Sequence, residues 1–415
     1  MSRNVMFLVG LVGAIGLVAA CSAANGGNAF DDGGGGAGGS VSSGRSPEPP
    51  STSPGGVGGF NPSTGAGNPR TDGGAPCTAS PDADFDKDGY TITQGDCNDC
   101  DANVNPDAIE VVVSEGDGGG APPEPADEDC DGTVDNPPGP CDDNLALDDT
   151  DPLHGAWAVD LCKQATPDGN DYGILSAKYV RANGSATGPS RQFGIFSGFG
   201  PNVNAQLGTR MLGLSSGRAR ITGQAGACGS PTCSGSGVSS PPAGFPQNVP
   251  GCPGGTNIND DIALEVRLRA PSNATGYKFK FKFYSFEYPE WICTSFNDQF
   301  ISLVSPPPMG SINGNISFDS QLNPVSVNIA FFDVCLTCPL GPGELSGTGF
   351  DTWNDAGGTS WLVTTAPVTG GEEISIRWAI WDTADQAWDS TALIDGFQWI
   401  ANGGTVVVGT EPIPE

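Results

Sequence analysis

An alternation of aromatic and charged residues in the second half of the chain predicts a half-buried β-strand. The sequence from Gly276 to Phe283 reads GYKFKFKF, so an aromatic ring and a lysine follow each other in turn. Because successive side chains of a strand point to opposite faces, this spacing puts the rings on one face and the lysines on the other.

Six further segments of the same half have short runs rich in β-branched and aromatic residues. Gly- and Pro-rich turns separate them, as is typical of successive strands. We expect these strands at residues 174–182, 261–270, 298–304, 325–332, 372–381 and 390–399. Many short strands without interleaved helices indicate a mainly β fold, an antiparallel β-sandwich. We assign it to residues 170–405.

A short amphipathic helix is expected just before the strands, in a connector that we assign to residues 141–169. Asp151 can cap its N-terminus. Pro152 suits the first helical position, because the N–H of that residue forms no hydrogen bond within a helix. The apolar spacing predicts a helix from Pro152 to about Lys163.

The first residues predict export. An apolar run from Val5 to Ala20 is too short to span a bilayer and is typical of a signal peptide, which we assign to residues 1–20. The ending LVAAC resembles a bacterial lipobox, in which the cysteine, here Cys21, is diacylated and becomes the mature N-terminus. In that resemblance Ser22 favours the outer membrane. We expect a lipid anchor at Cys21; an ordinary signal peptide followed by an unmodified cysteine is the alternative.

Residues 21–76 have the composition of a disordered linker. They are rich in Gly, Ser, Pro, Asn and Thr, and they offer almost no apolar surface for a core. Random-coil scaling gives such a tether a reach of roughly 40 Å. The whole chain has a net charge of −31, which argues against nucleic-acid binding because phosphate contacts require clustered Lys and Arg.

Acidic residues are concentrated between Cys77 and Asp151, where 22 Asp or Glu residues accompany a single lysine, Lys87. Carboxylates about 5 Å apart repel each other by on the order of 1 kcal/mol per pair even in water. A bound cation removes this repulsion. We therefore interpret residues 77–140 as an irregular metal-binding module; a solvated acidic linker is the alternative.

Two loops of this module have the ligand spacing of calcium loops. DFDKDG at residues 84–89 offers oxygens at positions 1, 3 and 5 and a glycine for the sharp turn, and ADEDCDGTVD at residues 126–135 repeats the alternate aspartates. An EF-hand would have Glu where this chain has Gly95, so a later carboxylate must close the first loop. The expected ligands are Asp84, Asp86, Asp88, the Tyr90 carbonyl, Asp96, Asp99, Asp101, Asp127, Asp129, Asp131 and Asp135.

The same module resembles the MopE-type metal-binding repeat of bacterial surface proteins and, more loosely, thrombospondin type 3 calcium repeats. The segments DFDKDGYT, GDCND, NPDAIE and DCDGTVD follow one another in the order of the family. Cys100 is additional, the cysteine expected after Glu110 is missing, and the insertion SEGDGGGAPPEP separates the two halves. Which carboxylates close each site therefore stays open.

Calcium is the expected ion, because all-oxygen sites favour hard cations. Copper, sometimes associated with this repeat family, prefers imidazole and sulfur ligands, yet the chain has a single histidine, His154. Zinc is conceivable at the CxxC pairs Cys97/Cys100 and Cys335/Cys338. The twelve cysteines other than Cys21 favour disulfides instead in an exported protein.

Two segments of the strand region resemble the choice-of-anchor L domain of bacterial surface proteins, over roughly residues 170–402. They are SFEYPEWICTSFND at 285–298 and DSTALID at 389–395. The resemblance implies no established chemistry. A possible second polar site consists of Glu287, Asn297, Asp298, Asp382, Asp385 and Asp389. It could complete a second calcium site; Asx turns and hydrogen bonds at strand ends are the alternative.

Together these patterns predict an exported, lipid-anchored outer-membrane protein without catalytic activity. Its calcium-binding stem would carry a β-sandwich that binds an extracellular protein or glycan. The alternative is a secreted-type polysaccharide hydrolase, in which two carboxylates such as Glu287 and Asp389 would flank the sugar.

Overall fold

The computed structural model describes residues 80–111 and 125–413, except for residues 189, 234, 330, 354–355 and 402–403. The expected signal peptide, Cys21 and the tether lie outside the described residues. Regular structure in the described part is almost entirely β, which confirms the predicted class. The helical elements there are α1 (Pro152–Trp157) and the 3-10 helices η1 (Ile92–Gln94), η2 (Gly343–Leu345) and η3 (Phe350–Thr352). No helix among the described residues is long and apolar enough to cross a membrane.

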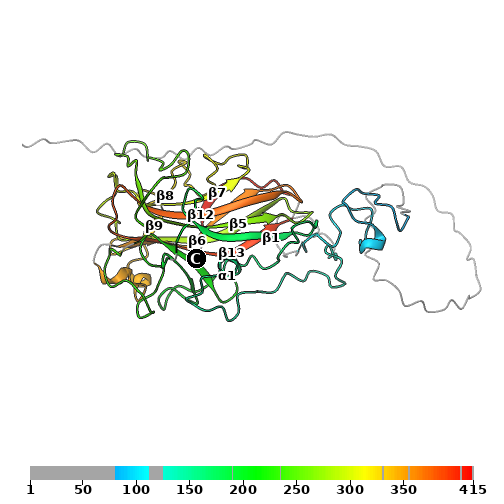
Figure 1. Cartoon of the computed structure of the whole chain (residues 1–415), viewed down its shortest axis with the longest axis horizontal. Coiled ribbons are helices and arrows are strands. Elements are labelled where there is room, and N and C mark those ends of the chain that lie inside the picture. The colour runs from blue at the N-terminus through cyan, green and yellow to red at the C-terminus, as the bar shows by residue number, and fades with distance from the viewer. Residues whose placement is uncertain are drawn as a thin grey trace, which may run out of the picture. The chain divides into compact units, whose positions relative to one another are not determined.

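Fourteen strands form two antiparallel sheets (Figure 1). The first sheet has the order β1-β5-β12-β7-β8, with β4 beside β5, and the second has the order β14-β11-β6-β13-β3-β2, with β10 joining β6 to β9. The strands of the first sheet are β1 (Gly173–Val180), β4 (Val238–Ser239), β5 (Ile258–Arg269), β7 (Gln299–Ser305), β8 (Val325–Ser326) and β12 (Glu373–Thr383). Those of the second are β2 (Phe193–Phe196), β3 (Met211–Ser215), β6 (Gly276–Ser285), β9 (Phe332–Val334), β10 (Gly357–Thr359), β11 (Leu362–Pro367), β13 (Ser390–Ile400) and β14 (Gly409–Pro412).

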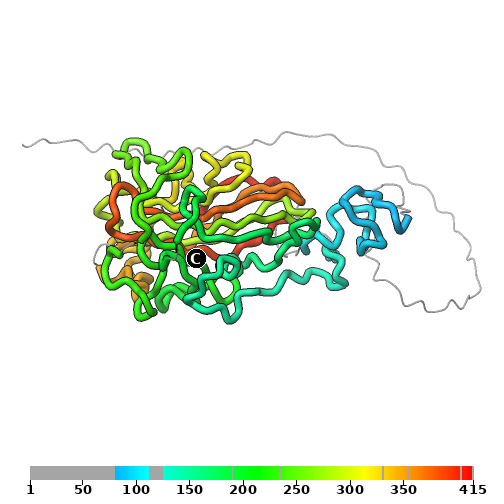
Figure 2. The backbone as a smooth tube through the Cα atoms, in the orientation of Figure 1, coloured from blue at the N-terminus to red at the C-terminus, as the bar shows by residue number. Residues whose placement is uncertain are grey.

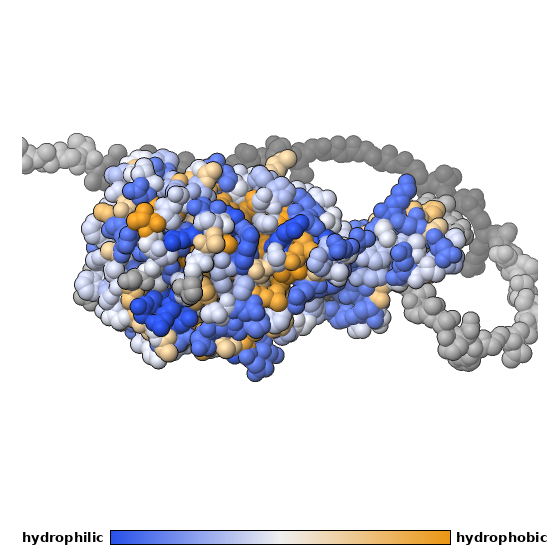
Figure 3. All heavy atoms as spheres, viewed as in Figure 1, coloured by the Kyte–Doolittle hydropathy of each residue, from blue (hydrophilic) through white to orange (hydrophobic). Residues whose placement is uncertain are grey.

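The two sheets share one hydrophobic core, as in a β-sandwich. Aromatic rings of β6 in the second sheet meet rings of the first sheet: the centroids of Phe279 and Trp378 are 5.5 Å apart, and those of Phe281 and Phe300 are 5.0 Å apart. All four side chains are fully buried. On the face shown in Figure 3, hydrophilic residues cover most of the surface and hydrophobic residues form patches among them.

The predicted burial of the aromatic face of β6 is confirmed, but its lysine face is not fully exposed. Tyr277, Phe279, Phe281 and Phe283 are fully buried. Lys282 is also buried, because η2 covers it and the Glu344 carboxylate binds its ammonium group at 2.5 Å. The outer face of this strand is therefore covered locally rather than open to solvent.

Two predicted boundaries differ from the structure. The helix ends at Trp157 instead of near Lys163, because Asp160 adopts the left-handed conformation (φ 69°) and the Cys141–Cys162 disulfide turns the chain back. The sandwich also continues past residue 405, since β14 pairs with β11. The Asp151 cap is present: its carboxylate accepts a hydrogen bond from the Leu153 N–H at 2.9 Å.

Five disulfides are described along the chain. They join Cys97 to Cys130, Cys141 to Cys162, Cys228 to Cys233, Cys252 to Cys293 and Cys335 to Cys338. Cys100 is also disulfide-bonded. Both CxxC pairs are thus engaged in disulfides, and neither is available as a zinc site. Figure 2 traces the path of the backbone through the described residues in the same orientation as Figure 1.

Candidate metal centre

The first aspartate of the acidic loop at residues 84–89 fixes the conformation of that loop. The Asp84 carboxylate accepts hydrogen bonds from the backbone N–H groups of Lys87 at 2.6 Å and Gly89 at 3.1 Å. Lys87 (φ 69°) and Gly89 (φ 101°) both adopt left-handed backbone conformations. Glycine at the second of these positions removes the steric cost of that turn, so the DxDxDG sequence dictates the local shape.

The loop at residues 127–132 repeats this geometry. Asp127 accepts a hydrogen bond from Gly132 N–H at 3.0 Å, at the same spacing as Asp84 and Gly89. Cys130 (φ 57°) and Gly132 (φ 91°) take the left-handed positions. The third position is equivalent as well, since Asp129 accepts a hydrogen bond from the N–H two residues later, as Asp86 does. The two halves of the module therefore contain the same structural loop.

Around the first loop, carboxylate oxygens converge to the distances of a calcium site. Oxygens of Asp84, Asp86 and Asp99 lie within 4.8 Å of one another, and so do oxygens of Asp86, Asp88 and Asp96. Calcium–oxygen bonds are 2.3–2.6 Å long, so two ligands on opposite sides of one ion are about this far apart. Sequence spacing offers Asp96, Asp99 and Asp101 for closing this loop, and the structure brings Asp96 and Asp99 to it but not Asp101.

The two oxygens of each carboxylate around the first loop differ in their hydrogen bonding. One oxygen each of Asp86, Asp88 and Asp96 accepts a backbone N–H, which fixes the side chain. The other oxygen, Oδ2 in each case, is buried and has no hydrogen-bond partner. Burial of an unsatisfied carboxylate oxygen is costly, and a cation bound among the three would satisfy all of them.

The second loop converges on a residue that sequence spacing did not single out. Oxygens of Glu110, Asp127 and Asp129 lie within 4.8 Å of one another, as do those of Glu110, Glu128 and Asp135. Glu110 is oriented by the N–H groups of Asp129 at 3.2 Å and Asp135 at 2.6 Å. It belongs to the NPDAIE segment, so the only signal for it was the resemblance to the metal-binding repeat.

Two of the expected ligands lie outside these groups. Asp101 accepts hydrogen bonds from the N–H and side-chain amide of Asn103. Asp131 is exposed, and the Asn136 amide and the Thr133 N–H lower the pKa of its carboxyl. Tyr90 donates its N–H to Asp88 at 2.8 Å, which keeps it beside the first loop.

The electrostatics of the first loop favour a bound cation. Burial, with the carboxylates of Asp88 and Asp99, raises the pKa of Asp86 to about 6. The same causes raise the pKa of Asp96 to about 6. Among the described residues, no lysine or arginine forms an ion pair with these carboxylates. Within the described part of the chain, no cationic side chain is therefore paired with Asp86 or Asp96 to offset this repulsion.

The two loops are connected to each other and to the sandwich. The Cys97–Cys130 disulfide links the end of the first site to the middle of the second loop. Asp107 accepts a hydrogen bond from the Tyr172 N–H at 2.6 Å. The Asn273 amide forms two hydrogen bonds with the backbone of Ile109, at 3.0 and 2.8 Å. The NPDAIE segment is thus shared between the metal-binding loops and the base of the sandwich.

The second polar site predicted from the sequence lies at one end of the sandwich. Five of its six residues are buried: Glu287, Asn297, Asp298, Asp382 and Asp389. Asp385 is half-buried and its carboxylate accepts the Ala387 N–H, as in an Asx turn. Burial, followed by repulsion between neighbouring carboxylates, raises the pKa of all four buried carboxyl groups.

Comparison with known proteins gives one match. The model of the choice-of-anchor L domain matches residues 173–398, just over half of the chain, from the start of β1 almost to the end of β13. No curated protein and no solved structure matches the chain.

Proposed function

The chain belongs to the choice-of-anchor L domain family, and we propose that it is a cell-surface lipoprotein whose calcium-loaded acidic module supports a binding sandwich. The family implies a β-rich protein that is exported or lies at the cell surface. The proposal adds three parts to this: calcium in both acidic loops, a lipid anchor at Cys21, and an extracellular protein or glycan as the partner of the sandwich.

One observation carries the calcium assignment: the inward Oδ2 atoms of Asp86, Asp88 and Asp96 are buried without partners and belong to one convergent group. All candidate ligands in both loops are oxygens, from carboxylates and the Tyr90 carbonyl, and such ligands suit calcium. Copper and zinc ligands are engaged elsewhere, since His154 contacts Asp149 at 2.6 Å and the module cysteines 97, 100 and 130 are in disulfides.

The calcium has a structural role in this proposal. Extracellular calcium modules bind with a Kd of roughly 10⁻⁴ to 10⁻³ M, so they stay loaded outside the cell and do not signal. A loaded ion fixes Glu110, and Glu110 ends the segment that contacts Tyr172 and Asn273. Calcium would therefore stiffen the connection between the anchor and the sandwich.

Substitution of Asp86 tests the calcium assignment directly. Asp86→Asn in the full chain is expected to remove one bound calcium ion per chain, because Asp86 belongs to both convergent groups of the first loop. Isothermal titration calorimetry with calcium measures the stoichiometry. Asp101→Asn is the matched control, since Asp101 lies outside both groups, and it should leave the stoichiometry unchanged. Equal stoichiometry in Asp86→Asn and the wild type would contradict the assignment.

The lipid anchor has its own test. Cells that express the wild-type chain are expected to incorporate radioactive palmitate into the protein, and Cys21→Ser should abolish the label because the acylated thiol is lost. Label that persists in Cys21→Ser would exclude this cysteine as the anchor.

Arrays of glycans and extracellular proteins, probed with the full chain, would then identify the class of partner.

The hydrolase alternative receives less support from the geometry. The carboxylates that would flank a sugar, Glu287 and Asp389, have exposed fractions of only 2% and 4%. A glycosidase must place both carboxylates against its substrate. With so little of these two side chains exposed, a polysaccharide cannot contact both carboxylates without a local rearrangement of this end of the sandwich.

A further inference from the structure

Four carboxylates, each in or next to a different strand, lie at one end of the sandwich. Glu287 follows β6 and Asp389 precedes β13, which are paired in the second sheet through Ser285 and Ser390. Asp298 precedes β7 and Asp382 lies in β12, which are paired in the first sheet. We call these four residues, Glu287, Asp298, Asp382 and Asp389, the end cluster.

Hydrogen bonds connect the end cluster across the two sheets. Asp298 accepts the Ser390 hydroxyl at 2.7 Å, which joins the first sheet to the second, and it accepts the Thr383 N–H at 3.0 Å. The Asp298 N–H in turn donates to Glu287 at 3.4 Å. Exposed fractions of the four residues lie between 0% and 4%. The cluster is therefore one buried polar unit rather than four separate surface groups.

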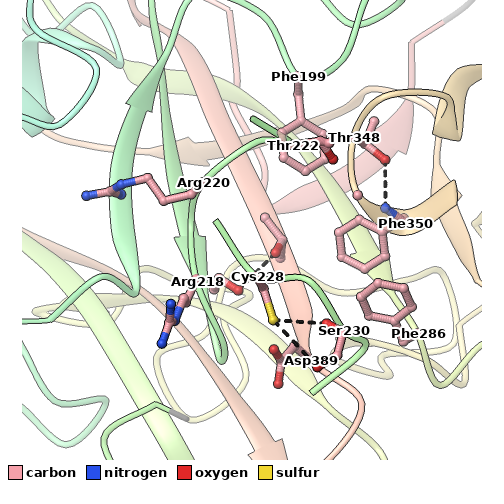
Figure 4. Close-up of a pocket in the computed structure, with 13 residues that line it drawn as sticks. Phe199, Arg218, Arg220, Thr222, Cys228, Ser230, Phe286, Thr348, Phe350 and Asp389 are labelled. Carbon is pink, nitrogen blue, oxygen red and sulfur yellow. Dashed lines mark hydrogen bonds between the residues drawn. The ribbon is translucent and has the colours of Figure 1, made fainter. Parts of the chain in front are cut away.

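The end cluster differs from other buried carboxylates of the same sandwich. Asp261 is fully buried, but Arg181 neutralises it at 2.7 Å. No lysine or arginine among the described residues forms an ion pair with the end cluster. Arg218, which lines the same pocket as Asp389 (Figure 4), acts on it only through its charge, which partly offsets the rise that burial causes in the pKa of Asp389, while its guanidinium donates to the Gly226 carbonyl.

A second observation, independent of charge, concerns unsatisfied oxygens. Asp382 has an exposed fraction of 0%, and neither of its carboxylate oxygens makes a well-formed hydrogen bond, although the Ser216 hydroxyl and the Asp298 carboxyl lie close to it. Oδ1 of Asp389 is unsatisfied as well, while its Oδ2 accepts the Cys233 N–H at 2.8 Å. The amide oxygen of the neighbouring Asn297 is a further buried oxygen without a partner. Four buried acceptors without well-formed hydrogen bonds favour a ligand that accepts lone pairs.

We propose that the end cluster binds one calcium ion in the interior of the sandwich. Calcium takes six to eight oxygen ligands in adaptable geometry, whereas magnesium retains several waters and rarely occupies an all-protein cage. A site with so little solvent exposure therefore favours calcium. Three oxygens from three of these carboxylates do not yet lie within 4.8 Å of one another, so binding draws the side chains together by rotation about their χ angles.

Terbium, which binds calcium sites, distinguishes this ion from those of the acidic module. Trp381 precedes Asp382 and Trp388 precedes Asp389, whereas residues 77–140 contain no tryptophan. Terbium emission excited through tryptophan, at wavelengths where tyrosine does not absorb, therefore reports on the end cluster. The full chain should give such emission, calcium should displace it, and Asp86→Asn in the module should leave it unchanged.

Asp382→Asn is expected to abolish this emission. Asp319→Asn is the matched control, because Asp319 is also buried but both of its oxygens accept hydrogen bonds from Gln321 and Asn323. Equal emission from Asp382→Asn and the wild type would overturn the proposal. Asp389→Asn provides a second variant if Asp382→Asn fails to fold.

A measurement that leaves the end cluster intact completes the test. Equilibrium dialysis with radioactive calcium on the full chain with Asp86→Asn and Glu110→Gln, which impair both module sites, should still show one bound ion. No bound calcium in that chain would overturn the end-cluster site, because only protons would then balance its charge. If instead the acidic module binds no calcium, neither Asp86→Asn nor Glu110→Gln should change the number of calcium ions that the chain binds.

Discussion

Removal of calcium from the full chain is expected to lower the free energy of unfolding by about 2.7 kcal/mol for each acidic-loop site that was held at 100 times its Kd. The reason is linkage: an ion that binds the folded loops and not the unfolded chain stabilises the fold. The carboxylates also repel one another once the ion leaves. Denaturant unfolding in calcium and in EDTA measures the difference, and the melting temperature should fall by several degrees.

The ion specificity is part of the same expectation. Calcium added back in excess of EDTA should restore stability, while magnesium at equal concentration should restore much less, because it dehydrates reluctantly. In Asp86→Asn the difference between calcium and EDTA should shrink. An unfolding free energy that EDTA does not change, or one that copper restores better than calcium, would contradict the assignment.

Truncation of the central aromatic layer is expected to have the largest effect of any single substitution in the sandwich. Phe281→Ala should cost about 3–5 kcal/mol, because the ring is fully buried and meets Phe300 of the opposite sheet at 5.0 Å. Denaturant unfolding at fixed calcium measures this cost. Phe281 is remote from the acidic loops in the fold, so its effect should add to that of calcium removal.

Phe85→Ala serves as the control for that experiment. The Phe85 side chain has an exposed fraction of 62%, and substitutions at such positions usually change stability by less than about 0.5 kcal/mol. A Phe281→Ala cost as small as that of Phe85→Ala would mean that the two sheets do not share the core described above.

Most long strands were predictable from the sequence, but β11, in which buried and half-buried residues alternate, was not predicted. β1, β5, β6, β7, β12 and β13 coincide closely with the predicted segments. β2 (FGIF) and β3 (MLGLS) were not predicted, because all their residues are buried and no polar position alternates with the apolar ones. The predicted strand at 325–332 contains a turn, and only its first two and last residues belong to strands β8 and β9.

The acidic loops were predictable because their geometry is local. Asp84 and Gly89 are five residues apart, and so are Asp127 and Gly132, so the spacing in the sequence determines the turn. Glu110 is separated from its partners in the second loop by 17 to 25 residues. Over such a separation, sequence spacing does not predict which side chains meet. The same limit explains why Lys282 seemed exposed: its partner Glu344 lies 62 residues away.

The Cys97–Cys130 disulfide gives the module a mechanical property. A pull between the N-terminal side of the module and the sandwich passes through this covalent link and bypasses the segment enclosed by a sequence separation of 33. Without the link, tension could extend that segment to roughly 110 Å. With it, Glu110 and the part of the second loop before Cys130 lie outside the load path, so tension reaches only the residues of that loop that follow Cys130.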